Sequence, residues 1–143
     1  MSADIFIPAR TSGHGQFTVD IDHEKAGWGY SGLRVVELEA GASQALETGD
    51  SELLVLPLAG SATVNVDGRD YELAGRPGVF QAVTDYLYVG RGKELTITSA
   101  AGGRFAFPSA VATKDLPTAY YPKETVRIDL RGAGDCSRQV NNY

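Results

Sequence analysis

Cysteine, histidine, clustered basic residues and long apolar stretches are all scarce in this 143-residue chain. Cys136 is the only cysteine, so neither an intrachain disulfide nor a thiolate cluster can form. No histidine lies nearby in the sequence to activate it, and we interpret it as an inert thiol. The 13 lysine and arginine residues are scattered among 18 aspartate and glutamate residues, giving a net charge of -5. This distribution argues against nucleic acid as a partner, because phosphate binding needs clustered positive charge.

A membrane location is not indicated either. No apolar run approaches the roughly 18 to 20 residues that a membrane-spanning helix requires. The start of the chain, Met1-Ser2-Ala3-Asp4, lacks the basic and apolar segments of a signal peptide. We therefore expect a cytoplasmic protein with no membrane partner, and a mass of 15.2 kDa suffices for one sizeable hydrophobic core.

Helical periodicity is missing, and short strand-like runs take its place. No segment carries apolar side chains at the i, i+3, i+4 and i+7 spacing, and 17 glycines would each weaken a helix interior. Short apolar or alternating runs separated by Gly, Pro, Asp and Asn predict an all-β sandwich or barrel with little helix. The predicted strands are residues 17–21, 33–38, 52–58, 62–66, 71–73, 86–89, 95–98, 105–107 and 126–130.

The clearest local prediction is a β-hairpin centred on Asp67-Gly68, a dipeptide typical of two-residue turns. Its apolar members would share one face, and the polar residues between them would share the other. The pairs that the turn predicts are Val66 with Arg69, Val64 with Tyr71, and Ala62 with Leu73.

Residues 41–60 keep the glycine spacing of a metal-binding β-barrel motif, Gly-x5-His-x-His-x3-Glu-x6-Gly, but not its ligands. Glu47, Gly49 and Leu53 stand at the three ligand positions. A mononuclear site needs three or four converging His, Asp, Glu or Cys side chains, and Glu47 with Asp50 reads only as a solvated carboxylate pair. The segment resembles a cupin barrel, an antiparallel jelly roll or double-stranded β-helix. We expect no metal or other cofactor in this chain.

The composition changes after Pro108, and we place a boundary there. Residues 1–108 are expected to form a non-metal cupin barrel. Residues 109–143 begin with a proline- and tyrosine-containing stretch typical of an extended connector, and one strand and a polar tail follow. Within that tail, Arg138 and Gln139 suit a carboxylate or a hydroxyl-rich ligand, although the same pattern fits a plain polar terminus.

Five segments carry a more specific pattern. They are Ala26-Gly27-Trp28-Gly29-Tyr30-Ser31-Gly32-Leu33, Leu46-Glu47-Thr48-Gly49-Asp50-Ser51-Glu52, Gly75-Arg76-Pro77-Gly78-Val79-Phe80, Leu87-Tyr88-Val89-Gly90-Arg91-Gly92 and Arg131-Gly132-Ala133-Gly134-Asp135-Cys136-Ser137-Arg138-Gln139-Val140-Asn141-Asn142. Together they resemble the N-terminal half of the 5-deoxyglucuronate isomerase family, bicupin enzymes of myo-inositol breakdown. The resemblance covers most of the chain, from about residue 28 to residue 142.

The resemblance implies an aldose-ketose isomerase, an intramolecular oxidoreductase that converts 5-deoxyglucuronate to 2-deoxy-5-keto-gluconate. Family members are about twice this length, and their metal-binding cupin is the C-terminal one. This chain would then be the N-terminal cupin domain, inactive alone, with residues 109–143 leading to a second cupin that it lacks. A divalent metal is expected in that absent barrel, and the catalytic residues have no counterparts here. Arg138 and Gln139 match the family string and are expected near the mouth of the second barrel, as contacts to the substrate carboxylate or the domain interface.

Two other hypotheses stay open. The chain could be a non-catalytic sugar-acid binding or regulatory cupin module in which Arg34, Arg76 or Arg91 holds a carboxylate, although the direction of the Arg34 side chain is ambiguous from the sequence. It could instead be a small metal-dependent enzyme that uses His14 and His23. Whichever hypothesis holds, a homo-oligomer is one possible partner state, because small barrels with exposed apolar edges often pair.

Overall fold

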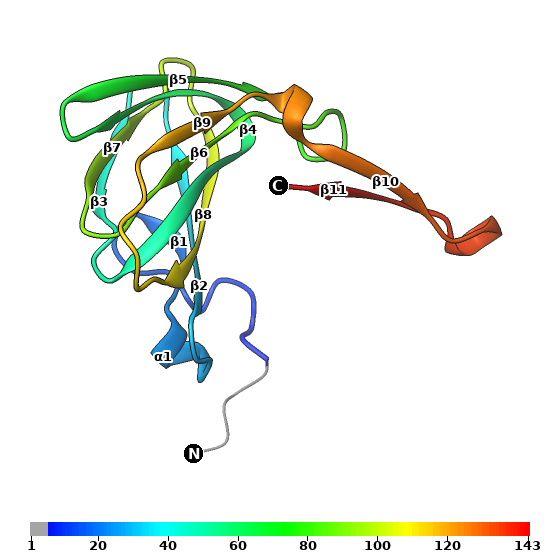
Figure 1. Cartoon of the computed structure of the whole chain (residues 1–143), viewed down its shortest axis with the longest axis horizontal. Coiled ribbons are helices and arrows are strands. Elements are labelled where there is room, and N and C mark those ends of the chain that lie inside the picture. The colour runs from blue at the N-terminus through cyan, green and yellow to red at the C-terminus, as the bar shows by residue number, and fades with distance from the viewer. Residues whose placement is uncertain (1–5) are drawn as a thin grey trace.

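The computed structural model describes residues 6–143 and is built almost wholly from antiparallel strands (Figure 1). This confirms the predicted all-β class. No helix in these residues has the length and hydropathy to cross a membrane. The elements in chain order are β1 (Phe17–Ile21), α1 (His23–Ala26), β2 (Ser31–Leu38), β3 (Ser43–Glu47), β4 (Ser51–Val66), β5 (Arg69–Arg76), β6 (Tyr86–Val89), β7 (Glu94–Thr98), β8 (Gly103–Val111), β9 (Ala119–Tyr121), the 3-10 turn η1 (Lys123–Thr125), β10 (Arg127–Arg131), the 3-10 turn η2 (Gly134–Cys136) and β11 (Arg138–Asn142).

The long strand β4 joins the two layers of the jelly roll. Its first half lies in a sheet with the order β1-β2-β8-β4-β6-β9, and its second half pairs with β5 and β7. Strand β3 adds to this second layer through β7. In the described residues the hydrogen-bonded order is open, with β1 and β9 at its ends. The two layers therefore face each other across the core and do not form one continuous ring of hydrogen bonds.

The core fills the space between the layers with aliphatic and aromatic side chains, whose burial is the main driving force for folding. Phe105 and Phe107 of β8 are fully buried, and Phe17 of β1 packs edge-on against Phe107 with a ring separation of 6.3 Å. The buried cluster consists of Val36, Leu38, Leu46, Leu53, Val55, Ala62, Val64, Val66, Leu73, Leu87, Val89, Leu95, Ile97, Phe105 and Phe107.

The hairpin between β4 and β5 has the predicted register at all three predicted pairs. Asp67 and Gly68 both have positive φ, 49° and 85°, as a two-residue turn that matches the strand twist requires. On the polar face, Asn65 Nδ2 donates to Asp70 Oδ1 at 2.6 Å. The opposite face belongs to the core, so alternation and turn chemistry agree in fixing this hairpin.

The C-terminal segment differs from the extended connector that the composition predicts after Pro108. Strand β8 continues through Pro108 to Val111, and β9 (residues 119–121) pairs with β6, so both stretches belong to the barrel sheet and only residues 112–118 between them lie outside any strand. The physical reason is the aromatic side chains, since Tyr121 stacks on Tyr86 with ring centroids 5.0 Å apart. After η1, β10 and β11 form a separate two-stranded sheet that projects from the barrel (Figure 1).

Candidate functional site

The three ligand positions of the metal-binding motif lie in environments that do not fit a metal ion. Glu47 ends β3 with an exposed side chain, and Gly49 turns the loop before β4 with a φ of 59°. Leu53 is only 2% exposed and packs inside the core cluster. Gly49 supplies no side-chain ligand, and Leu53 supplies only hydrocarbon. The segment therefore keeps the turn of the motif but does not provide the side chains that would bind a metal.

The two histidines do not complete such a donor set. No group of three His, Cys, Asp or Glu side chains within residues 6–143 is arranged to hold a metal. The side chain of His14 is 85% exposed, and its Nδ1 lies 3.7 Å from Asp20 Oδ2. His23 begins α1 and lines a pocket at the mouth of the barrel. A metal-dependent enzyme based on these two imidazoles would need a third ligand, and the described part of the chain does not place one beside them.

Arg34 brings a fixed positive charge beside the first of the three ligand positions. Its Nη2 donates to the carbonyl oxygen of Glu47 at 3.2 Å, and its guanidinium lies 5.5 Å from the ring centre of Phe17. Burial lowers the pKa of Arg34, because desolvation disfavours the charged form, and the carboxylate of Asp20 partly offsets this effect. The side chain, ambiguous in the sequence, therefore lies at the mouth of the barrel.

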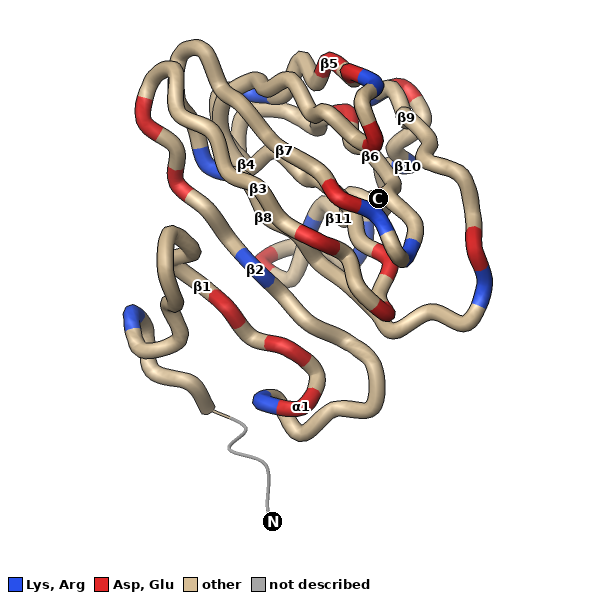
Figure 2. Tube along the Cα trace, turned by 90° about the vertical axis from the view of Figure 1, so that its left-hand side faces the viewer, with Lys and Arg blue, Asp and Glu red and all other residues tan. Residues whose placement is uncertain are grey.

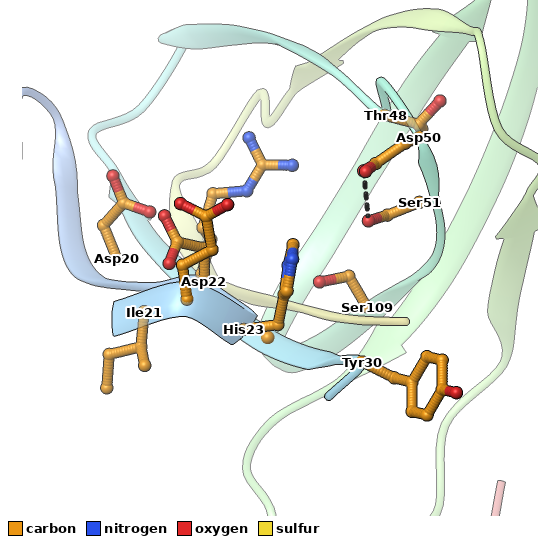
Figure 3. A pocket seen from close by; sticks show the side chains of 12 residues that line it. Asp20, Ile21, Asp22, His23, Tyr30, Thr48, Asp50, Ser51 and Ser109 are labelled. Atoms are coloured by element: carbon orange, nitrogen blue, oxygen red, sulfur yellow. Dashed lines mark hydrogen bonds between the residues drawn. The ribbon is translucent and has the colours of Figure 1, made fainter. Parts of the chain in front are cut away.

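A pocket of about 330 Å³ opens at this mouth and is lined mainly by polar side chains. Figure 2 shows acidic segments along β1 and α1 beside a basic segment of β2. In the close view, Asp20 and Asp22 lie on one side and Asp50 on the other, with His23 and Ser109 between them (Figure 3). Carboxylates, a hydroxyl, an imidazole and a guanidinium thus come together from four separate parts of the chain.

Local structure holds the two acidic walls of the pocket in place. Asp22 is the N-cap of α1, and its Oδ1 accepts a hydrogen bond from the Lys25 backbone N–H at 2.7 Å. Asp50 Oδ1 accepts a hydrogen bond from the Ser51 hydroxyl at 3.1 Å. Each bond uses one carboxylate oxygen, so Oδ2 of both residues keeps its hydrogen-bonding capacity for a ligand. The arrangement can accept hydrogen bonds at both sides and donate them from Arg34.

The other two candidate arginines are held by contacts within the chain. Arg76 is 7% exposed, and it donates to two backbone carbonyls, that of Pro57 at 2.9 Å among them, and to the Tyr143 hydroxyl at 2.9 Å. Arg91 pairs with Asp115 at 2.7 Å on the surface. Both side chains brace the barrel, and of the three arginines only Arg34 lines the pocket at the mouth.

Arg138 and Gln139 lie on β11, in the projecting hairpin, and the structure does not bring them to the Arg34 pocket. Both are exposed. Arg138 Nη1 donates to the Cys136 carbonyl at 3.3 Å, and Gln139 Nε2 donates to Asn141 Oδ1 at 2.9 Å. Their family-derived role at a second barrel stays a prediction.

Sequence reasoning missed part of the pocket. It noted Asp50 but not Asp20, Asp22 or Ser109. The available signal was an Asp-x-Asp pair at the end of the predicted strand 17–21. Because 18 acidic residues make such pairs common, that signal gains meaning only once β1, β8 and the loop before β4 are seen to meet.

Comparison with known proteins gives consistent relatives. The KduI/IolB family matches residues 5–143. The 5-deoxy-glucuronate isomerase of Geobacillus kaustophilus is 28% identical over 140 residues, covering 96% of this chain and 51% of that protein. The protein of the same name from Listeria innocua is 30% identical over 127 residues, covering 86% and 46%. The chain therefore spans about half the length of the curated relatives it matches.

Solved structures support the same grouping. An IolB-like protein from Salmonella typhimurium LT2 superposes with a TM-score of 0.83 at 26% identity, covering 92% of this chain and 51% of that one. A cupin protein from Bacteroides fragilis superposes with a TM-score of 0.52 at 16% identity, covering 78% and 92%, a likeness of fold alone. The jelly roll is thus of the cupin type that the glycine spacing of residues 41–60 predicts. With a match that runs from residue 5 to the last residue, the chain belongs to the KduI/IolB family.

Proposed function

We propose that this chain serves as the N-terminal, non-catalytic cupin domain of a 5-deoxyglucuronate isomerase. The complete enzyme would convert 5-deoxyglucuronate to 2-deoxy-5-keto-gluconate in myo-inositol catabolism. The family match and the names of the relatives support this proposal. The observation that most supports a structural role for this half is Leu53, a core residue at a motif position where a ligand would stand.

The chemistry of the reaction supports the same division. An aldose-ketose isomerisation moves a proton between adjacent carbons, which requires a base for that proton and a group that polarises the neighbouring carbonyl. Glu47, Gly49 and Leu53 do not supply such a pair. We place the substrate sugar acid, the divalent metal and the catalytic residues in the second cupin domain. A cytoplasmic location and a homo-oligomer are further predictions for the protein.

The projecting hairpin is the proposed link to that second domain, and residues 109–143 are the segment leading to it. Ile128 and Leu130 are 49% and 82% exposed on one face of the hairpin. Gln139 lies opposite Leu130 on that face, and Arg138 lies opposite Arg131 on the other. Like charges placed directly opposite each other destabilise a strand pair. A carboxylate from the second domain or the substrate would relieve this repulsion, which supports the interface role proposed for Arg138. Gln139 lies on the exposed apolar face that the second domain would cover.

A chimera tests the proposal directly. This chain would replace the N-terminal half of the Geobacillus kaustophilus isomerase, and turnover of 5-deoxyglucuronate would be compared among the chimera, the 143-residue chain and the remaining C-terminal half. We expect activity in the chimera, and none in the 143-residue chain. Turnover by the 143-residue chain above the uncatalysed rate would show that catalysis does not lie elsewhere. A folded chimera without activity would contradict the assignment to this enzyme.

The alternative, a non-catalytic module that binds a sugar acid, is favoured only by the position of Arg34 in the pocket. The charge of that pocket works against it, because the carboxylates around the guanidinium repel an acidic ligand. Calorimetric titration of the metal-free chain with uronates tests this alternative, which needs saturable binding.

A further inference from the structure

Arg34 keeps hydrogen-bonding capacity that the protein does not use. A guanidinium carries five N–H donors, and the hydrogen bond to the Glu47 carbonyl uses one of them. None of the ion pairs within residues 6–143 includes Arg34. Because half-buried donors gain from having partners, the pocket presents a fixed, directional donor next to the position where a metal-binding cupin holds its first ligand.

The acidic walls supply the complementary acceptors. Asp20, Asp22 and Asp50 line the pocket, and their carboxylate oxygens are hydrogen-bond acceptors. Hydrogen bonds from neutral hydroxyls to carboxylates are charge-assisted and short. A ligand with several hydroxyl groups can therefore donate to these walls and accept from Arg34 at the same time. At about 330 Å³ the pocket is at the lower end of the range for small-ligand sites, suitable for a ligand the size of one sugar ring.

The charge balance selects among hydroxylated ligands. The lining holds four carboxylates, including that of Glu24, against one guanidinium and one imidazole, so acidic groups predominate. A carboxylate on the ligand is attracted by Arg34 but repelled by the carboxylates of the pocket walls. A hydroxymethyl group at the same place is not repelled. We propose that this pocket binds a neutral sugar or polyol, at a site distinct from the reaction assigned to the second cupin.

Matched pairs of ligands that differ only in charge test this proposal on the metal-free 143-residue chain. D-Glucose with D-glucuronate, D-galactose with D-galacturonate, and sorbitol with gluconate would be titrated at low salt by two-dimensional NMR. At least one neutral member should bind saturably, with a Kd of about 1 mM or tighter. Its acidic counterpart should bind about tenfold more weakly, and the gap should narrow as salt screens the walls. Shifted resonances should map to the ends of β1 and β2 and to the loop before β4.

Variants assign the binding to named side chains. Arg34→Met keeps an apolar side chain near Phe17 and removes the donors, so it should weaken the neutral ligand about tenfold. Arg69→Met is the matched control, because Arg69 also lies over an aromatic ring, 5.0 Å from the centre of Tyr71, but is exposed on β5. It should change nothing. Asp50→Asn alters an exposed loop residue and should selectively improve binding of the acidic member.

Three outcomes would overturn the proposal. Tighter binding of the acids than of their neutral partners would reverse the charge argument. Equal binding by the Arg34→Met and Arg69→Met variants would place the ligand elsewhere. Absence of saturation by every member at about ten times the expected Kd would exclude this ligand class. None of these results depends on isomerase turnover, so the chimera experiment stays an independent test of the proposed function.

Discussion

The two hairpins of this chain, β4–β5 and β10–β11, are both antiparallel but depend on different interactions. In the first, an apolar face lies in the core and Leu73 is 2% exposed. In the second, the most exposed apolar side chain, Leu130, is 82% exposed, and Asp129 accepts hydrogen bonds from Arg127, Arg131 and Asn142. One hairpin is stabilised by burial and the other mainly by exposed polar contacts.

The difference shows that strand pairing alone does not tell how a hairpin contributes to stability. A two-stranded hairpin without a buried face is marginal in water. The β10–β11 hairpin is therefore expected to open locally at much lower free energy than the barrel, as segments with few buried contacts generally do. Its exposed apolar face is the feature that the proposed second domain would cover.

The same substitution in both hairpins gives the largest contrast. Leu73→Ala should lower the free energy of unfolding by about 2–5 kcal/mol, because it leaves a cavity in a core that cannot fully relax. Leu130→Ala, the matched control, should change it by less than about 0.5 kcal/mol. Urea denaturation followed by circular dichroism measures both. Equal losses would mean that the β10 side chain is buried in the isolated chain.

Two aspartates give the next contrast. Asp85 is 3% exposed and accepts hydrogen bonds from the backbone N–H groups of Ala74 and Gly75 and from the Tyr120 hydroxyl, at 2.8 to 2.9 Å. Asp85→Asn should lower the free energy of unfolding by about 1–3 kcal/mol, because an amide NH₂ in that place faces other donors. Asp129→Asn in the projecting hairpin should leave global unfolding unchanged. A global loss for Asp129→Asn in urea titrations would contradict the separation of the two hairpins.

The pKa of Tyr120 gives the Asp85 variant a second readout. Burial, and then the hydrogen bond to Asp85, raise the pKa of Tyr120 to about 12. Since the unfolded-state value is lower, this contribution to stability is present below about pH 10 and is lost as the pH rises toward 12. Asp85→Asn should lower the pKa of Tyr120. Spectrophotometric titration against a Tyr120→Phe variant isolates the signal, and an unchanged titration would mean that Asp85 does not act on this phenol.

The sequence predicts most of the barrel because alternation and turn chemistry are local. The strands over residues 17–21 and 86–89 begin and end as predicted, and the Asp67-Gly68 hairpin has the predicted register. Strands β3, β9 and β11 were missed. In β3 only Leu46 is buried, and β11 has no fully buried residue, so neither carries a strong apolar pattern. Pairing with β7, β6 and β10, respectively, defines β3, β9 and β11.

The pocket could not be predicted from the sequence, because strands that are distant in the sequence form it. Whether Arg34 points into the barrel depends on the pairing of β1 with β2, where a bulge between Phe17 and Val19 shifts the register. Ser109 joins the site because β8 pairs with β2 and continues past Pro108, after which the sequence predicts a connector. Pairing between distant strands therefore determines both the direction of Arg34 and the position of Ser109, and no short sequence motif predicts such pairing.

Protonation of Asp129 should loosen only the projecting hairpin. Hydrogen bonds from Arg131, and then from Arg127 and Asn142, hold the pKa of Asp129 below its ordinary value of 3.8, with desolvation acting in the opposite direction. Its contribution is therefore present above about pH 3.8 and is lost as the pH falls through the lower folded-state pKa. Amide resonances of β10 and β11, followed by NMR below pH 5, should shift toward coil values before those of the barrel. Asp129→Asn should remove this pH dependence, and a hairpin that stays paired until the barrel itself unfolds would contradict it.

Leu130→Asp should have the smallest effect on the stability of the 143-residue chain but a clear effect on the contact between the two domains. Leu130→Asp changes a side chain that is 82% exposed, so the free energy of unfolding of the 143-residue chain should stay within about 0.5 kcal/mol of the unmodified value. In the Geobacillus chimera the same substitution would bury an unpaired charge if the second domain covers this face, and such burial is strongly unfavourable. Limited proteolysis between the halves and turnover of 5-deoxyglucuronate measure the consequence, with Thr113→Asp, an exposed residue at which the charge changes by the same amount, as the control. A chimera indifferent to Leu130→Asp would leave the apolar face of β10 uncovered in the enzyme, and the hairpin would then not be the contact between the two cupins.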